Sequence, residues 1–269
     1  GKQAEFFSMS IAERNRLMDI AVEVAANAGD RGGIGHCGIV TSCSDTNLDV
    51  VLELAEHSQN IGADYVIVHS PVLHFGADTD ETIYEYYHYL SEKINIGLAM
   101  WNHPDCGYVM SPELCARIAE LPNVVAIKYS TDRARYKRLT EMVGDKIHVS
   151  NPDEPDWLDN IIELGWKLYL CSTPPFLLQT SVDQRMNDYT RLAFAGKFDE
   201  ARKVRDSLEP VRQALRQSKP KGKPQAHGKY WQELIGQHGG PVRRPLLQLT
   251  EEERAATRAA FDQSGLKTA

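Results

Sequence analysis

The sequence lacks the long apolar run that a membrane span requires, because none of its stretches approaches ~18 consecutive apolar residues. We expect no signal peptide at its start either. Positive charge is not in excess: 30 Lys and Arg residues stand against 37 Asp and Glu, for a formal net charge of −7. Proteins that bind nucleic acid or anionic membranes concentrate positive charge, so we expect neither partner and predict a cytoplasmic protein.

Paired cysteine motifs are missing as well. The five cysteines are odd in number, are irregularly spaced and include no Cys-x-x-Cys pair. We therefore expect reduced thiols and no disulfide framework. Zinc sites draw on paired spacings that recur, and neither His36 beside Cys37 nor His103 with Cys106 is repeated elsewhere. We therefore expect no metal site, and nothing in the sequence implies a cofactor.

The composition that is present is ordinary for a globular protein, with 42% apolar and 25% charged residues. The 269 residues exceed one small module and fall short of two full domains. Barrels of alternating strands and helices, by contrast, commonly reach about 250 residues as one domain.

Helical and strand-like patterns alternate along the first two thirds of the chain. Apolar periodicity predicts helices over 10–27, around 48–55, over 79–93, from 111 onward, and over 133–143 and 154–164. Compact apolar runs predict strands at 65–68, 96–101, 124–128, 146–150 and 167–171, after a β-branched pair at 39–40. The remainder is predicted to be helical, over 176–194, 197–217, 226–236 and 250–262. This order favours parallel βαβ units and a (β/α)₈ barrel, although five clear strands leave such a barrel incomplete.

Barrel active sites form where strands end, and Lys128 ends the apolar strand 124–127. Apolar neighbours disfavour an ammonium ion and so favour the neutral amine, which is the form that condenses with a ketone. The alternative is a lysine that has left the sheet and reached solvent.

Several segments around Lys128 resemble one enzyme family. The family has a Tyr-Asn-x-Pro segment, a Ser-Pro-Glu-Leu helix start and a Pro-Asn-Ile-Val-Gly-Ile-Lys strand. This chain has similar segments at 101–104, 110–114 and 121–128, and its two ends, 1–8 and 240–254, are also similar. The sequence thus resembles the dihydrodipicolinate synthase/N-acetylneuraminate lyase family, as a divergent member.

The resemblance implies a (β/α)₈ barrel with a C-terminal helical extension and a Schiff-base lysine at Lys128. It divides the chain into a barrel over 1–175 and a helical extension over 176–269. It also implies that the first strand–helix unit is missing from this sequence, since Gly1 matches the end of the second barrel strand.

The sequence departs from the family pattern at positions that bind substrate and transfer protons in the family. Lys2 and Gln3 replace two threonines that bind the substrate carboxylate and relay protons, and Trp101 replaces the tyrosine that shuttles protons. Tryptophan donates a hydrogen bond but cannot exchange its proton near neutral pH. A second tyrosine is replaced by Leu73, an arginine by Cys106 and a pocket glycine by Asn151. We therefore do not expect dihydrodipicolinate synthesis itself.

We predict a lyase that forms a Schiff base with a 2-oxo acid such as pyruvate, by aldol cleavage or loss of water. The catalytic residues would be Lys128 and Trp101, and substrate-binding residues would be Lys2, Gln3, His103, Asn151 and Cys171. Protons would pass through His103, His69, Lys2 or water. One alternative is a barrel that has lost catalysis and serves as a small-molecule binding or regulatory protein. Another is a metal-dependent aldolase, which a chelator would inhibit.

The resemblance also implies a homotetramer built as a dimer of dimers. The loop over 70–75 contains Leu73 and Phe75 and is unusually apolar for a segment that leaves a strand end. Such a loop needs a partner surface, either a second copy of the chain or its own tyrosine-rich helix over 79–93. We expect light scattering to give an oligomer, and Leu73→Asp to weaken it. A monomeric mass, or unchanged assembly in the variant, would show that the loop packs on its own chain.

Overall fold

The computed structural model describes residues 4–28, 37–71, 79–171 and 177–268. It divides into two compact units. The strand unit comprises Met9–Pro152 and Trp166–Leu170, and the helical unit comprises Gly1–Ser8, Asp153–Gly165 and Cys171–Ala269. Among the helices that the structure describes, none combines the length and apolar character needed to cross a bilayer. The predicted boundary at residue 175 falls outside the described residues and stays a prediction.

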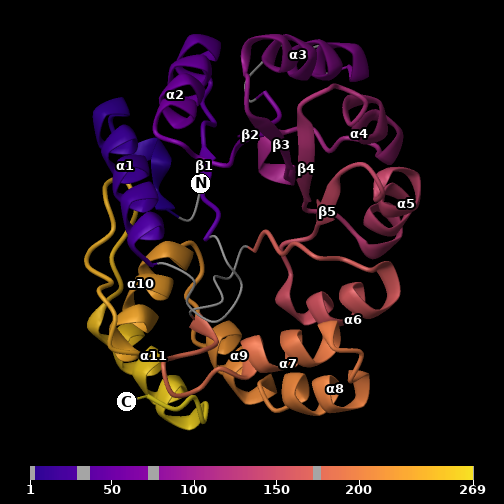
Figure 1. Cartoon of the computed structure of the whole chain (residues 1–269). Helices are drawn as coiled ribbons and strands as arrows, with labels where there is room; N and C mark the ends of the chain where they lie inside the picture. Colours follow the sequence, from indigo (N-terminus) through magenta and orange to yellow (C-terminus); the bar gives the residue numbers. More distant parts are fainter. Residues whose placement is uncertain (1–3, 29–36, 72–78, 172–176, 269) are drawn as a thin grey trace. The chain divides into compact units, whose positions relative to one another are not determined.

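The strand unit is one parallel sheet whose five strands follow the order of the chain, β1-β2-β3-β4-β5. The strands are β1 (Val40–Ser42), β2 (Tyr65–His69), β3 (Gly97–Asn102), β4 (Val124–Tyr129) and β5 (His148–Ser150). The helices are α1 (Ile11–Ala28), α2 (Leu48–Asn60), α3 (Asp80–Lys93), α4 (Pro112–Ile118) and α5 (Arg133–Val143), with the short 3₁₀ helix η3 (Pro104–Cys106) after β3. Helices α2 to α5 lie along one side of the sheet (Figure 1).

Local side-chain caps explain where these helices begin. Ser10 and Glu13 form the predicted reciprocal capping box, with Ser10 N donating to Glu13 Oε2 (2.9 Å) and Glu13 N donating to Ser10 Oγ (3.2 Å). Ser111 Oγ accepts from Leu114 N, and Pro112 occupies the first turn of α4, where it costs no hydrogen bond. Each cap satisfies backbone N–H groups that a helix leaves unpaired at its start.

On the side of the sheet that the helices cover, apolar side chains are buried and the polar groups named below are hydrogen-bonded. Val66, Val68 and Ile127 are fully buried, and Thr41 Oγ1 on β1 donates to Ser58 Oγ on α2 (2.8 Å). The Tyr129 hydroxyl donates to the Met110 carbonyl just before α4 (2.6 Å). Because side chains alternate along a strand, the neighbours of these residues point to the opposite face.

A register shift between β3 and β4 sets which residues of β4 face which way. Leu98 pairs with Val124 but Ala99 pairs with Ala126, so Val125 is an extra residue in β4. Gly97 makes room for this bulge: a Cβ at Gly97 would lie 2.9 Å from Tyr65 Cβ and 3.0 Å from Val125 Cγ2. A side chain at position 97 would therefore collide with its neighbours on both adjoining strands.

The helical unit contains η2 (Phe6–Ser8), α6 (Glu154–Leu164), α7 (Arg185–Phe194), α8 (Phe198–Asp206), α9 (Glu209–Gln217), α10 (Pro224–Leu234) and α11 (Glu251–Gln263). A buried charge pair joins three of these helices. Arg212 on α9 donates from Nε to Glu154 Oε2 (2.6 Å) and from Nη2 to Oε1 (2.9 Å), and the Tyr189 hydroxyl on α7 donates to Oε1 (2.6 Å). Glu154 is 3% exposed and Arg212 is 6% exposed.

Three predicted elements differ in the structure. Helix 176–194 begins only at Arg185. The single helix predicted over 197–217 is two helices, since Pro210 cannot donate a backbone hydrogen bond and opens α9 instead. The strand predicted over 167–171 is absent. Leu170 N donates to the Ser150 side chain (2.8 Å), whereas in a strand it would donate to a backbone carbonyl of the neighbouring strand.

The buried Glu154–Arg212 pair predicts a large stability effect. Replacing Arg212 with Ala leaves a buried carboxylate without its cation, which costs about 3–5 kcal/mol. We expect urea denaturation of Arg212→Ala to show a loss of this size. The control is Arg216→Ala, because Arg216 pairs with Glu209 at the surface, where both side chains are about half exposed. That pair is worth about 0–1 kcal/mol, so equal losses in the two variants would contradict the assignment.

Candidate active site

Four side chains form a row across the carboxyl ends of β2 to β5. The strand register pairs His69 with Trp101, Trp101 with Lys128, and Lys128 with Ser150. Residues paired in this way on neighbouring parallel strands lie about 4.8 Å apart and point to the same face. Lys128 precedes Tyr129, whose hydroxyl is bonded on the helix side, so the row occupies the other face of the sheet.

Lys128 is half-buried in β4 and lies against Trp101. Its Nζ is 5.4 Å from the centroid of the Trp101 ring, within the range of a cation–π contact. The lysine therefore stays within the row, and its amine lies beside the face of an aromatic ring.

Trp101 is the centre of the row. It is 8% exposed, and its ring lies 6.0 Å from that of His69 and 6.1 Å from that of His103. The indole Nε1 is buried and, within the described part of the chain, has no hydrogen-bond partner. The hydroxyl oxygens of Ser42, Ser70 and Ser130, which also lie at strand ends, share this property. Buried polar groups are normally bonded, so this end of the sheet has unmet hydrogen-bonding capacity.

His69 is buried and held in one orientation. Its backbone N donates to Ser44 Oγ (3.1 Å), and its Nδ1 lies 2.9 Å from the Ser70 carbonyl oxygen. A carbonyl oxygen only accepts, so Nδ1 carries the proton and the lone pair is on Nε2. Burial lowers the pKa of His69, so the neutral ring predominates near neutral pH. His69 can therefore accept a proton at Nε2.

His103 is the N-cap of η3 and directly follows β3. Its Nδ1 accepts a hydrogen bond from Asp105 N (3.1 Å), so the neutral ring carries its proton on Nε2. The side chain is 29% exposed. Cys106, where the resemblance implies an arginine, is buried in the same turn, and its backbone N donates to the His103 carbonyl (2.9 Å).

Arg14 is a residue that sequence reasoning missed. It reaches from α1 to the end of β1, where Nη1 donates to Asp45 Oδ2 (3.1 Å) and Nη2 donates to the Ser42 and Ser44 carbonyls (3.0 Å each). It is 5% exposed, and burial lowers its pKa. The available signal was its position four residues before Met18, on the buried face of α1. Arg14 fixes the strand end that supplies Ser44 to His69.

Of the other predicted site residues, the structure describes Asn151 and Cys171 but not Lys2 and Gln3. Asn151 is 2% exposed and its Nδ2 donates to the Thr131 carbonyl (3.3 Å). Cys171 is a partly exposed cysteine that belongs to the helical unit. Lys2 and Gln3 lie outside the described residues, as do Leu73 and Phe75 of the proposed subunit contact. The substrate-binding roles of these residues stay predictions.

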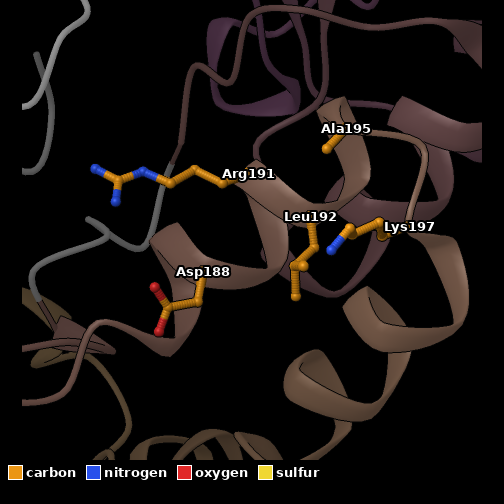
Figure 2. Close-up of a pocket in the computed structure, with 5 residues that line it drawn as sticks. All are labelled: Asp188, Arg191, Leu192, Ala195 and Lys197. Atoms are coloured by element: carbon orange, nitrogen blue, oxygen red, sulfur yellow. The ribbon is translucent and has the colours of Figure 1, made fainter.

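Hollows elsewhere on the described surface do not include the row. One of about 430 Å³ is lined by Asp188, Arg191, Leu192, Ala195 and Lys197, and the side chains of Asp188 and Arg191 extend to the same side of α7 (Figure 2). Another of about 450 Å³ lies between α2 and the residues at the end of α3. Within the described ranges, no polar atom that is buried without a partner belongs to either lining, and no group of three or more acidic, His or Cys side chains is arranged to hold a metal.

The row lies at the carboxyl ends of parallel strands, which is where barrel enzymes place their active sites. Residues 1–264 match the profile of the Dihydrodipicolinate synthetase family. The chain therefore belongs to this family.

Individual relatives are distant but cover the chain. The 4-hydroxy-tetrahydrodipicolinate synthase of Hyphomonas neptunium is 26% identical over all of this chain and 86% of its own length. The structure of a chloride-inhibited dihydrodipicolinate synthase from Acinetobacter baumannii, complexed with pyruvate, has a TM-score of 0.82 at 22% identity and covers 99% of this chain and 86% of that one. A monomeric dihydrodipicolinate synthase variant has a TM-score of 0.81 at 23% identity, covering 99% and 84%. These likenesses confirm the predicted (β/α)₈ barrel fold class with C-terminal helices.

The Trp101 indole N–H, which has no acceptor among the described residues, predicts a difference between two tryptophans of the strand unit. Trp166 is similarly buried, and its Nε1 donates to Thr140 Oγ1 (3.0 Å). Replacing either residue with Phe removes the same volume, but only Trp166→Phe also removes a hydrogen bond, worth about 1 kcal/mol. We expect chemical denaturation to show a smaller stability loss for Trp101→Phe. An equal or larger loss would mean that the Trp101 N–H is bonded in the free protein.

Proposed function

We propose that this protein is a lyase that forms a Schiff base between Lys128 and a 2-oxo acid, and then cleaves a carbon–carbon bond or eliminates water. The observation that carries the proposal is the position of Lys128, half-buried in β4 with its amine 5.4 Å from the Trp101 ring centroid. Family membership and the pyruvate complex of a relative support the substrate class.

The reaction begins with a neutral amine and a ketone. The Lys128 nitrogen attacks the C2 carbonyl carbon, and the carbonyl oxygen leaves as water with the two amine hydrogens, so that a C=N bond replaces the C=O bond. One proton from solvent then binds the imine nitrogen and gives the iminium group. In aldol cleavage the C3–C4 bond breaks and its electron pair enters the iminium group to give an enamine, while the C4 hydroxyl loses a proton and becomes an aldehyde. Protonation at C3, followed by attack of water on the iminium carbon, releases the shortened 2-oxo acid and restores the amine.

Two residues of the row have distinct parts in this scheme. The iminium group is cationic at the position where the face of the Trp101 ring provides negative electrostatic potential, so the ring stabilises the charged intermediate. Trp101 cannot take up the C4 hydroxyl proton, because an indole nitrogen only donates. We assign that step to His69, whose Nε2 lone pair can accept a proton directly or through one water molecule. His103, Asn151, Cys171, Lys2 and Gln3 stay proposed contacts of the substrate.

The proposal includes assembly as a dimer of dimers. The contact would be the apolar loop over 70–75, of which residues 72–75 are outside the described ranges. One related structure is that of a monomeric dihydrodipicolinate synthase variant, so the oligomeric state of this chain must be measured.

The second candidate is a barrel that binds a 2-oxo acid without turnover. It is favoured by one observation: the residue that the resemblance matches to the proton-shuttling tyrosine is Trp101, a buried tryptophan that cannot exchange its proton near neutral pH. Binding that persists in Lys128→Ala, together with a wild-type protein that shows no chemistry on any keto acid, would favour this candidate.

The nucleophile can be tested without knowing the natural substrate. Iminium–enamine interconversion exchanges the methyl hydrogens of pyruvate with deuterium from solvent, which proton NMR detects. We expect exchange by the wild type and a rate below about a hundredth of it in Lys128→Ala, since a positioned acid or base alone supplies only ~10²–10⁴-fold. Borohydride should trap a pyruvate adduct that mass spectrometry locates at Lys128.

Lys146→Ala is the control, because Lys146 is an exposed lysine paired with Glu120. Its exchange rate and adduct should equal those of the wild type. The nucleophile assignment fails if Lys128→Ala keeps wild-type exchange, or if the adduct is on another lysine.

A further inference from the structure

The structure buries two arginines among the residues that it describes, and they are paired differently. Arg212 forms two hydrogen bonds with the buried carboxylate of Glu154. Arg14 donates through Nη1 to Asp45, which is 28% exposed, and through Nη2 to two backbone carbonyls at the end of β1 (3.0 Å each). A buried cation paired in this way is often no more stabilising than an apolar side chain of similar volume. Stability alone therefore does not account for a positive charge at this strand end.

The strand end that Arg14 holds also holds His69. Ser44 is fully buried; its carbonyl accepts from Arg14 Nη2, and its Oγ accepts from the backbone N of His69 (3.1 Å). In a continued parallel ladder a backbone carbonyl of β1 would accept from His69 N, so the Ser44 hydroxyl ties β2 to β1 beyond their last paired residues. The His69 ring is fixed by its Nδ1–H, which donates to the Ser70 carbonyl (2.9 Å). A shift of Ser44 would therefore move the side chain that carries Nε2.

Arg14 and Asp45 also act on His69 through their charges. Burial is the main cause that lowers the pKa of His69, and its hydrogen bonds to the backbone act in the opposite direction. The Asp45 carboxylate also raises this pKa and the Arg14 guanidinium lowers it, because an anion favours the imidazolium ion and a cation disfavours it. Removing one of the two charges would leave the other unbalanced, so the two removals would have opposite effects on His69.

The other titratable groups that interact with this charge pair are neutral. Burial raises the pKa values of the Cys43 thiol and the Tyr86 hydroxyl, so both are uncharged near neutral pH. On the β3 side His69 lies next to the Trp101 ring, which carries no charge, and the Lys128 amine is one strand further along the row. Within the described ranges, the two charges that act on His69 from the β1 side are therefore Arg14 and Asp45.

We infer that Arg14 is a positioning residue for proton transfer: through Ser44 it holds His69 at the row, and its charge, opposed by that of Asp45, acts on the proton that His69 carries. The inference rests on the proposed function, in which His69 Nε2 takes the proton of the C4 hydroxyl as the C3–C4 bond breaks. The imidazolium then gives a proton to C3 of the enamine, which leaves His69 neutral again. A nearby cation makes the imidazolium a stronger acid and so favours this return.

The charge effect can be tested by deuterium exchange of pyruvate at saturating concentration, followed by proton NMR over a pH series. At saturation the rate reports on groups of the enzyme–substrate complex, and it should fall on the acid side as His69 becomes protonated. We expect Arg14→Gln, which removes the cation, to move this acid limb to higher pH. Asp45→Asn, which removes the anion, should move it to lower pH. A purely structural role gives no reason for two neighbouring substitutions to shift the limb in opposite directions.

Ser44→Ala tests how His69 is held. It removes the acceptor of His69 N without changing any charge, so the exchange rate should fall about tenfold to a hundredfold, the scale of a misplaced catalytic group, while the acid limb stays in place. The pyruvate concentration that half-saturates borohydride trapping at Lys128 should remain at the wild-type value, because attack of the amine does not use His69. The control is Ser58→Ala. Ser58 is equally buried and donates to the Leu54 carbonyl (2.7 Å), so neither value should change.

The outcomes separate this inference from the proposed function. Acid limbs that stay in place or move in the same direction, or wild-type exchange in Ser44→Ala, would overturn the inference and leave the Schiff-base proposal standing. Wild-type exchange in His69→Ala would do the same, because His69 would not be the base. If Arg14→Gln fails to fold, Asp45→Asn and Ser44→Ala decide the question by themselves. If the wild type forms no adduct at Lys128, the proposed function fails, and the inference fails with it.

Discussion

The candidate site depends on the common direction and register of the parallel strands. Because β2 to β5 all run the same way, their carboxyl ends meet at one edge, and four residues that are distant in the sequence become neighbours in the row His69, Trp101, Lys128 and Ser150. No single loop supplies this group. The amine next to the ring is a consequence of strand pairing, and the helices that enforce that pairing lie on the other side of the sheet.

The two faces of the sheet satisfy different requirements. On the helix side Thr41 is bonded to Ser58 and Tyr129 to Met110, and the side chains around them are apolar. On the row side, buried donors at Trp101 and Ser130 lack acceptors among the described residues. A chain selected for stability alone would not keep such groups, because each costs free energy that a bonded or apolar replacement would recover. The helix side therefore stabilises the sheet, and the row side holds the side chains of the candidate site.

Local sequence signals predicted most of the elements. Helices 133–143 and 154–164 have the predicted bounds, and the Ser10–Glu13 capping box is present, because periodicity and caps are local properties. The break before Pro210 was missed because apolar periodicity continued through it. Arg14 could not be found in this way, since its partners lie about 30 residues further along the chain. Lys128 was proposed from its strand and its family resemblance, but the Trp101 N–H, which lacks an acceptor among the described residues, is a property of the folded neighbourhood that no motif encodes.

The extra residue Val125 has a consequence for how this protein can change during evolution. Because Val125 is extra, the alternation of side chains along β4 shifts by one residue at this point. After the shift, Lys128 pairs with Trp101 in the row, and Tyr129 points to the helices. Deleting Val125 would join Val124 directly to Ala126 and remove the bulge, while the pairs Ala99–Ala126 and Trp101–Lys128 keep their register. A lineage can therefore lose one codon here without moving Lys128 from the row, and a side chain at position 97 would then no longer meet Val125. Deleting a residue between Ala99 and Trp101 would have the opposite effect, because β3 has no extra residue in that stretch to absorb the change of register, so Trp101 would lose its pairing with Lys128.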